Sequence, residues 1–253
     1  MPVHPDPASF LLYGDDGTPL AALRLKDDDG ERVAARVRPL PGIPASRVAA
    51  QARRDFAGMR LETPDDALLA AFVATGLEPR RAATEMIHDL SGLPAPRDLP
   101  DGWSLAEPGW DEDLAGAMAA AYGPDHPDGR FTEADRAYIG GMFATGEPVP
   151  PLVPASARLA DPAGRSAGHI LCAGPVPWTD YPCAWVLNLS VGPHAQGRGF
   201  GRDLLLHALH GTREAGLPAL ALSVVDGNPA RRLYESAGFR TENRVLSVTL
   251  PAA

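Results

Sequence analysis

Short apolar stretches separated by turn residues run through the first 90 positions. Two of them flank an Asp-Asp-Gly turn within residues 10–26, which predicts a β-hairpin. Residues 31–39 alternate apolar and polar like a third strand. Residues 46–56 and 65–75 have helical composition, and Gly76 closes the second helix. Residues 81–90 fit either type of element, and we expect a strand.

A proline-rich stretch, residues 91–100, follows this first part. Proline lacks a donor N–H and restrains the residue before it, so the stretch is expected to be extended. We therefore predict a first domain at 1–90, a linker at 91–100 and a second domain at 101–253.

Strands and helices alternate through the second part. Strands are predicted at 103–106, on either side of a turn within 157–171, and at 184–191, 219–225 and 245–250. Helices are predicted at 111–122, 132–143, 201–215 and 229–237. The late alternation implies βαβ crossovers and parallel pairing between some of the strands.

Composition narrows the class of protein. The 253 residues are 45% hydrophobic and 22% charged, as in globular proteins. No apolar run approaches the roughly 20 residues that cross a bilayer, and the N-terminus lacks a signal-peptide pattern. A net charge of −9 gives no support for binding to nucleic acid or an anionic membrane. We expect a cytoplasmic protein.

The number of cysteines also fits a cytoplasmic protein. Cys172 and Cys183 are the only two cysteines, too few for a disulfide framework or a zinc site. Both lie in apolar strand-like segments, so we expect buried free thiols and no metal.

Candidate chemistry begins at the end of the strand predicted at 184–191. Glycines stand at positions 197, 199 and 201, just before an apolar helix. Such glycines let a backbone approach an anion, and the first-turn N–H groups of the helix then face it. The pattern predicts a phosphate or pyrophosphate site. It is not a Walker A loop and it fails the G-x-G-x-x-G spacing, and a plain βα turn remains the alternative.

The segment from Gln196 to Gly201 resembles the Q/R-x-x-G-x-G/A signature of the GCN5-related N-acetyltransferases (GNAT). Downstream, Asn228 to Phe239 looks like the family's N-x-x-A-x-x-x-Y-x-x-x-G-F motif, with one residue fewer between Asn228 and Ala230. The resemblance covers roughly residues 101–253. It implies an α+β GNAT fold, with a mixed, mostly antiparallel sheet flanked by helices, and acetyl-CoA as co-substrate.

The resemblance also implies roles for single residues. Tyr234 is the expected general acid, because a phenol is protonated at neutral pH and can donate to a departing thiolate. Asn228 is expected to contact the cofactor or to cap the next helix. A bulge in the preceding strand is expected to open a V-shaped gap for the cofactor. The predicted cofactor-binding residues are Leu189, Ser190, Val191, Gln196, Gly197, Arg198, Gly199, Phe200, Gly201, Asn228 and Ala230.

The general base is where the sequence departs from the family. Many members carry a glutamate on the strand corresponding to 184–191, whereas this strand has no carboxylate and Asn188 is not a base. A base reached through water, or an acceptor that arrives neutral, is also possible. The candidates elsewhere are His126, Glu107 and Asp180, and then Asp125 and His194.

The first part shows a faint similarity to the second. Gly238-Phe239 lies 162 positions after Gly76-Leu77, and the same shift places Tyr234 on Phe72. This predicts a degenerate half-GNAT copy at 1–90, which lacks the glycine signature and the tyrosine hydroxyl and so is not catalytic. Coincidence between two αβ units is the alternative.

The sequence thus predicts an N-acetyltransferase that moves an acetyl group from acetyl-CoA to a primary amine. The acceptor is a small molecule or a peptide, and the protein is a monomer or a homodimer. A non-catalytic acyl-CoA-binding regulatory module and a nucleotide-binding protein are the alternatives.

Overall fold

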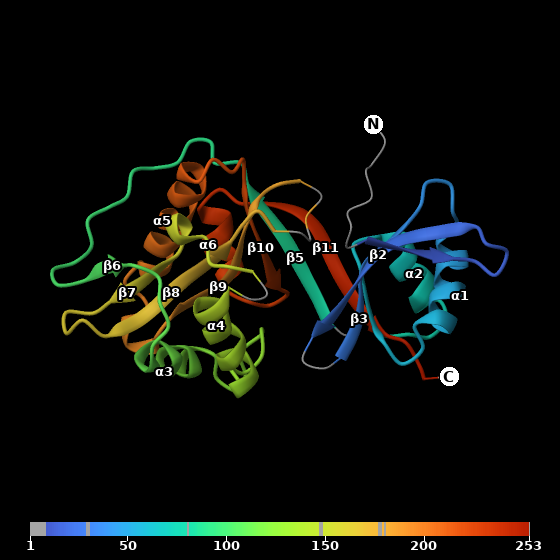
Figure 1. Ribbon diagram of the computed structural model, residues 1–253, viewed down its shortest axis with the longest axis horizontal. Coiled ribbons are helices and arrows are strands. Elements are labelled where there is room, and N and C mark those ends of the chain that lie inside the picture. Colours follow the sequence, from blue (N-terminus) through green and yellow to red (C-terminus); the bar gives the residue numbers. More distant parts are fainter. Residues whose placement is uncertain are drawn as a thin grey trace. The chain divides into compact units, whose positions relative to one another are not determined.

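The structure is a computed structural model that describes residues 9–28, 31–79, 81–146, 149–176, 179 and 181–252 (Figure 1). The chain forms two compact units. Unit 1 comprises Met1–Thr84 and Asn243–Ala253, and unit 2 is Glu85–Glu242. The chain passes from one unit to the other twice, within strand β5 (Arg81–His88) and within strand β11 (Arg240–Thr249).

The boundaries between these units, at 84/85 and 242/243, differ from the domain boundaries predicted at 90 and 101. The proline-rich segment 91–100 lies inside unit 2, where Leu93 and Leu99 pack against the core. The Pro94 carbonyl accepts a hydrogen bond from His210 Nε2 at 2.9 Å. Proline makes this segment extended, but extended chain can still pack. The passages between units occur in strands, where composition gives no signal of a boundary.

Unit 1 is a five-stranded sheet with two helices. Its strand order is β1-β2-β3-β4-β11, and all neighbours are antiparallel except the parallel pair β3/β4. Its core gathers the apolar side chains of the sheet and both helices, including Leu61, Leu68 and Phe72. Its elements, besides parts of β5 and β11, are β1 (Ser9–Tyr13), β2 (Pro19–Asp28), β3 (Glu31–Pro39), α1 (Ala45–Asp55), β4 (Arg60–Thr63) and α2 (Asp66–Val73).

Strands β3 and β4 pair over a short stretch. The paired residues are Val33 with Arg60 and Ala34 with Leu61, and the Thr63 hydroxyl donates to the Val37 carbonyl at 2.8 Å. The register of β3 against β2 shifts nearby, where Arg36 adopts a left-handed φ of 53°. The order strand, helix, strand, helix is the one expected of a half-GNAT copy, and the copy itself stays a prediction.

Unit 2 is a mixed sheet with helices on both faces, as expected for the α+β class. Its strand order is β5-β10-β9-β8-β7-β6, in which β10 and β9 are parallel and β9, β8, β7 and β6 are antiparallel. The strands are β6 (Ser104–Ala106), β7 (Ala157–Ala160), β8 (Ser166–Ala173), β9 (Ala184–Val191) and β10 (Leu220–Val225). The helices are α3 (Glu112–Ala121), α4 (Glu133–Thr145), α5 (Phe200–Glu214) and α6 (Ala230–Ser236).

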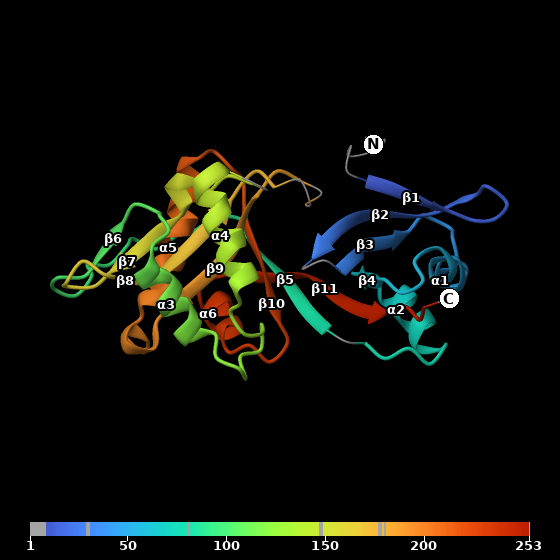
Figure 2. The ribbon, with the colours of Figure 1, turned by 60° about the horizontal axis from the view of Figure 1, so that its bottom comes forward.

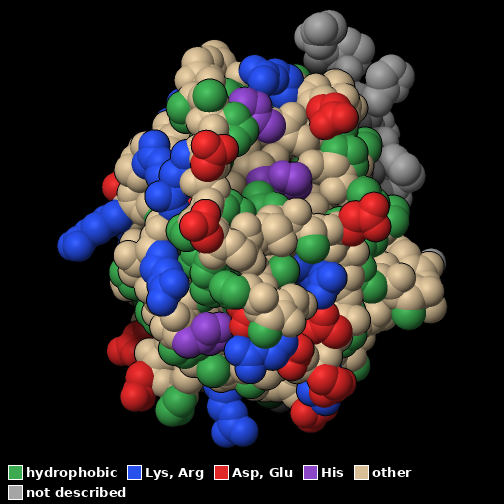
Figure 3. All heavy atoms as spheres, turned by 90° about the vertical axis from the view of Figure 1, so that its left-hand side faces the viewer, with side chains coloured by type: hydrophobic (Ala, Val, Ile, Leu, Met, Phe, Trp, Pro, Cys, Tyr) green, Lys and Arg blue, Asp and Glu red, His purple; other side chains and the backbone are tan. Residues whose placement is uncertain are grey.

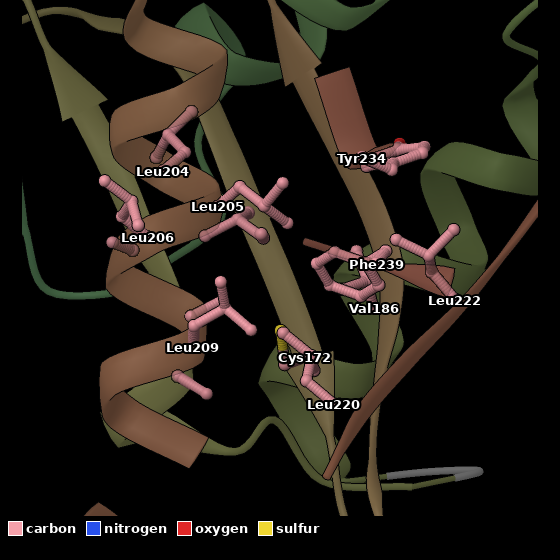
Figure 4. Close-up of a cluster of buried hydrophobic side chains, with 14 of the residues drawn as sticks. Cys172, Val186, Leu204, Leu205, Leu206, Leu209, Leu220, Leu222, Tyr234 and Phe239 are labelled. Atoms are coloured by element: carbon pink, nitrogen blue, oxygen red, sulfur yellow. The ribbon is translucent and has the colours of Figure 1, made fainter. Parts of the chain in front are cut away.

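The two faces of this sheet follow the period-2 alternation of strand β8. Leu171 packs with Leu114 and Met118 of α3, so α3 and α4 cover one face (Figure 2). Cys172 points to the opposite face and packs with the leucines of α5 (Figure 4). Leu205 is fully buried there. Every residue of β8 is buried, because helices cover both faces of the sheet at this strand. Its sequence therefore does not alternate between apolar and polar residues.

Most predicted elements are present within a few residues of their expected bounds, including the strand at 81–88. Strand β4 was not predicted, because four residues are too few to show alternation. Cys172 and Cys183 are buried free thiols, as expected. None of the helices in the described ranges has the length and apolar character that crossing a membrane requires. On the face shown in Figure 3, acidic and basic side chains are interspersed.

Candidate active site

A glycine turn joins the end of β9 to helix α5. After Val191 and the short 3-10 helix η2 (Pro193–Ala195), the chain turns through Gly197 and Gly199. Their φ angles are 76° and 86°, a region that side chains rarely adopt. Helix α5 then begins at Phe200, which is buried while the turn before it is exposed. The first N–H groups of a helix have no acceptor within it, so this turn presents free donors to solvent.

The residues around the turn are held by specific contacts. The Gln196 side-chain amide donates to the Val191 carbonyl at 2.9 Å. A Cβ on Gly201 would meet a methyl group of Leu233 at 3.4 Å, so α5 and α6 approach each other closely here. Of the six residues predicted to hold a pyrophosphate, Gln196 to Gly199 form an exposed turn, and Phe200 and Gly201 begin the 15-residue helix at its positive end.

Strands β9 and β10 form a V beside this turn. They pair in parallel only through Ala184 with Leu220 and Trp185 with Ala221. The register of β9 against β8 then shifts, leaving Leu187 as the extra residue. A bulge bends its strand, so β9 diverges from β10 toward their carboxyl ends. The predicted bulge and gap are both present.

Leu189, Ser190 and Val191 lie on the diverging part of β9, where the sequence predicted cofactor contacts. The backbone of this segment no longer pairs with β10, which leaves its edge facing the gap. Ser190 is buried, and its Oγ makes no hydrogen bond with any described residue.

The other arm of the V ends at Asn228. Its side-chain oxygen accepts the Ala230 N–H at 2.8 Å and so caps α6. Its side-chain nitrogen donates to Asp128 Oδ2 at 2.6 Å. Asn228 is 8% exposed, so both of these hydrogen bonds lie in a nearly dry environment. The expected capping role is present, and the amide nitrogen binds a carboxylate.

Tyr234 lies on α6 with its ring in the core of unit 2, next to Phe239 (Figure 4). Burial raises the pKa of the Tyr234 hydroxyl above its ordinary value, and the neighbouring Tyr122 and Asp128 raise it further. The phenol is therefore protonated at neutral pH, as a proton donor must be.

Tyr122 was not predicted from the sequence. It follows α3, and its hydroxyl donates to the Leu189 carbonyl at 3.3 Å and accepts from the Asn188 amide at 3.2 Å. Asn188 in turn bonds His169 Nε2 at 2.7 Å. Burial raises the pKa of Tyr122 to about 12, with a contribution from Asp128.

The loop between α3 and α4 connects to both arms of the V. Tyr122, at its start, bonds β9, and Asp128 bonds the residue that caps α6. A pocket of about 630 Å³ opens beside this loop. It is lined by Glu112, Ala115, Gly116, Ala119, Tyr122, Gly123, Pro124, Arg130, Phe131, Thr132, Glu133 and Arg136.

Of the two main base candidates that the structure describes, His126 lies close to this cluster and Glu107 does not. The His126 ring lies 4.4 Å from that of Tyr122, and its Nδ1 is 4.0 Å from Asp128 Oδ2. Glu107 is exposed and follows β6, with β7 and β8 between it and β9. Asp180 lies outside the described residues.

The two further candidates are also exposed, Asp125 in the loop and His194 in η2. Asp128 is the carboxylate that the sequence missed. It stands two residues after the candidate His126, in the same loop, but its contact with Asn228 spans 100 positions. Within the described ranges no group of histidine, cysteine or acidic side chains could hold a metal ion.

Comparison with known proteins agrees with this geometry. Residues 119–239 match the model of the Acetyltransferase (GNAT) family. The chain is a member of the GNAT family. The matched residues include the glycine turn, the V and α6 with Tyr234, so the family signature and the described site coincide.

Several curated GNAT relatives carry one name. A mycothiol acetyltransferase of Thermomonospora curvata is 36% identical over 181 residues, 68% of this chain and 56% of that protein. Another, from Pseudarthrobacter chlorophenolicus, is 32% identical over 76% of this chain and 60% of that protein. The chain thus spans little more than half the length of these relatives.

Solved GNAT structures share the fold. A GCN5-related N-acetyltransferase from Sphaerobacter thermophilus superposes with a TM-score of 0.66 at 17% identity, covering 97% of this chain and 82% of that one. A tandem GNAT protein from the clavulanic acid biosynthesis pathway gives 0.57 at 18% identity, with 96% and 83% coverage. The predicted α+β GNAT fold is confirmed.

Proposed function

We propose that this protein is an N-acetyltransferase that moves the acetyl group of acetyl-CoA to a primary amine of a small molecule by direct transfer. The observation that carries the proposal is the glycine turn at the start of α5, placed at the open end of the β9/β10 gap. The turn suits the pyrophosphate and the gap suits the pantetheine arm. Bound acetyl-CoA supplies a thioester carbonyl carbon open to attack by an amine.

The fit of the turn to a pyrophosphate rests on its backbone. Gly197 has no heavy atom within 4 Å of where a Cβ would stand, so its surface is open. The exposed turn and the unpaired first-turn N–H groups of α5 then offer donors to an anion. Leu189, Ser190 and Val191 line the gap, and Asn228 and Ala230 begin the helix that carries Tyr234.

Tyr234 is proposed as the acid. As the new C–N bond forms and the C–S bond breaks, the departing sulfur takes up the phenolic proton. The raised pKa of Tyr234 keeps that proton available across the neutral range.

Asp128 is proposed as the group that receives the amine proton. Amines have pKa values of about 8 to 10.4 and must lose a proton to attack. Asp128 is placed by the Asn228 amide at 2.6 Å, and it influences the pKa values of both Tyr122 and Tyr234. Its side chain is 29% exposed, so a proton can pass onward to solvent. His126 beside it is the predicted alternative.

The acceptor is proposed to be a small amine because several curated relatives are named mycothiol acetyltransferases. The pocket beside Tyr122 provides space for it and carries both acidic and basic side chains. A cytoplasmic location and the absence of nucleic-acid, membrane and metal partners remain predictions.

The test is thiol release from acetyl-CoA with a panel of amines. The panel contains amino acids, polyamines, aminoglycosides, peptide N-termini and the acceptor of the mycothiol acetyltransferases. We expect turnover with at least one small amine and loss of turnover in Tyr234→Phe. Binding of acetyl-CoA without turnover on any amine would instead support the regulatory-module alternative.

A further inference from the structure

The segment before β6 runs along helix α5. Near the second half of the helix, His210 bonds the Pro94 carbonyl at 2.9 Å. At the start of the helix, the Trp103 ring lies 4.4 Å from that of Phe200, and the Arg198 guanidinium is 5.5 Å from the centre of the Trp103 ring. The segment therefore reaches the glycine turn.

Arg97 makes the most specific of these contacts. Its Nε donates to Asp203 Oδ1 at 2.6 Å, and its Nη2 donates to Asp203 Oδ2 at 2.7 Å. The same Nη2 donates to the Arg198 carbonyl at 2.8 Å. A guanidinium that holds both oxygens of a carboxylate has a fixed orientation. Arg97 thus ties the first turn of α5 to the backbone of the glycine turn.

The close approach of Arg97 also bears on why position 199 is a glycine. A Cβ at this position would lie 2.7 Å from Arg97 Nη2. A side chain at position 199 would be strained by the φ of 86° and would also have to displace the end of the Arg97 side chain.

Asp203 presents an electrostatic problem for anion binding. It lies in the first turn of α5, and its side chain is only 5% exposed. A carboxylate there is stabilised by the helix dipole, but it also offsets the positive field that attracts a pyrophosphate. A buried charge is weakly screened by solvent. Arg97, whose side chain is 50% exposed, supplies the compensating positive charge at the surface.

We propose that Arg97 is a positioning residue for coenzyme A: it holds the Arg198 carbonyl so that the glycine turn keeps its shape, and it neutralises Asp203 so that the start of α5 attracts the pyrophosphate. The inference rests on the proposed function, since it assigns the turn to coenzyme A. It extends the cofactor site to a segment far from both family motifs.

The experiment measures the dissociation constant of coenzyme A by calorimetry, together with the melting temperature. Three variants are compared with wild type: Arg97→Ala, Arg97→Lys and the double variant Arg97→Ala/Asp203→Asn. Arg158→Ala is the matched control. Arg158 likewise donates to a carboxylate, Asp111, and to a backbone carbonyl, that of Glu107, but it lies on β7 away from the turn.

Arg97→Ala is expected to weaken coenzyme A binding by about tenfold, the scale of a charge at a helix end. Arg97→Lys should retain part of the affinity, because it keeps the charge but not the paired hydrogen bonds. The double variant should bind more tightly than Arg97→Ala, because it no longer has an uncompensated carboxylate. Arg158→Ala should lower the melting temperature and leave the affinity unchanged.

Two results would overturn the inference without touching the proposed function. One is wild-type affinity in Arg97→Ala. The other is equal loss of affinity in Arg97→Ala and Arg158→Ala, which would reduce Arg97 to a general stabilising contact. Failure of the wild-type protein to bind coenzyme A would instead remove the proposed function, and the inference with it.

Discussion

The side-chain nitrogen of Asn228 lies 2.6 Å from Asp128 Oδ2, across 100 positions of sequence. This bond fixes a carboxylate whose charge acts on Tyr122 and Tyr234, whereas strand β9 itself has no acid. It gives the proposed reaction a proton acceptor from a loop rather than from strand β9.

Replacing Asp128 with Asn tests this assignment. The amide keeps the size of the side chain but cannot accept the amine proton, so kcat should fall by about a hundredfold or more. The KM for acetyl-CoA should change little, because the glycine turn is intact. Steady-state kinetics with an amine that the panel shows to be a substrate provide the measurement. Asp125→Asn, an exposed aspartate in the same loop, is the control, and equal effects of the two substitutions would exclude Asp128 as the base.

Tyr234→Phe removes the proposed acid without changing the ring packing around Phe239. We expect a large drop in kcat with little change in melting temperature. Because burial raises the pKa of Tyr234, the wild-type rate should not decline through loss of this proton below about pH 10, the ordinary tyrosine value. A pH–rate profile checks this, and a variant as active as wild type would show that the thiolate is protonated by another group.

The two glycines of the turn should respond differently to alanine. At Gly197 the added Cβ meets open space, so the cost is the left-handed backbone alone, about 1–2 kcal/mol. At Gly199 the Cβ also meets the Arg97 guanidinium. Gly199→Ala should therefore weaken coenzyme A binding more than Gly197→Ala does. Calorimetry on both variants measures this, and the reverse order would contradict the described packing.

His169 should make unit 2 sensitive to acid. Burial lowers the pKa of His169 to about 4, from an unfolded value near 6.5, so the unfolded chain binds more protons between these pH values. Stability is complete above pH 6.5 and is lost as the pH falls toward 4, by about 2 kcal/mol at pH 5 from this residue. Urea unfolding at pH 7 and pH 5 measures the loss. His169→Gln, which can still bond Asn188, should show a smaller difference between the two pH values, and an unchanged difference would assign the effect elsewhere.

The local parts of the site were predictable from sequence. The glycine turn follows from residues that are neighbours along the chain, where backbone preferences act. Asn228, Tyr234 and the bulge in β9 came from family resemblance.

The parts that the sequence did not reveal depend on distant contacts. Asp128, Tyr122 and Arg97 are ordinary residues in loops, and their roles come from partners 66 to 106 positions away. The proline-rich segment shows the same limit: its composition correctly indicated extended chain, but not that this chain packs along α5. Glu107 lies away from the gap because sheet order, and not sequence distance, decides which strands border it.

The two passages of the chain between units have a consequence for synthesis in the cell. Strand β4 of unit 1 pairs with residues 246–249 of β11, which follow all of unit 2 in the sequence. Unit 1 thus keeps an unpaired strand edge while unit 2 is being made, although most of unit 1 is made first. Such an edge is prone to pairing with other chains, so the time taken to synthesise unit 2 should influence the yield of correctly folded protein.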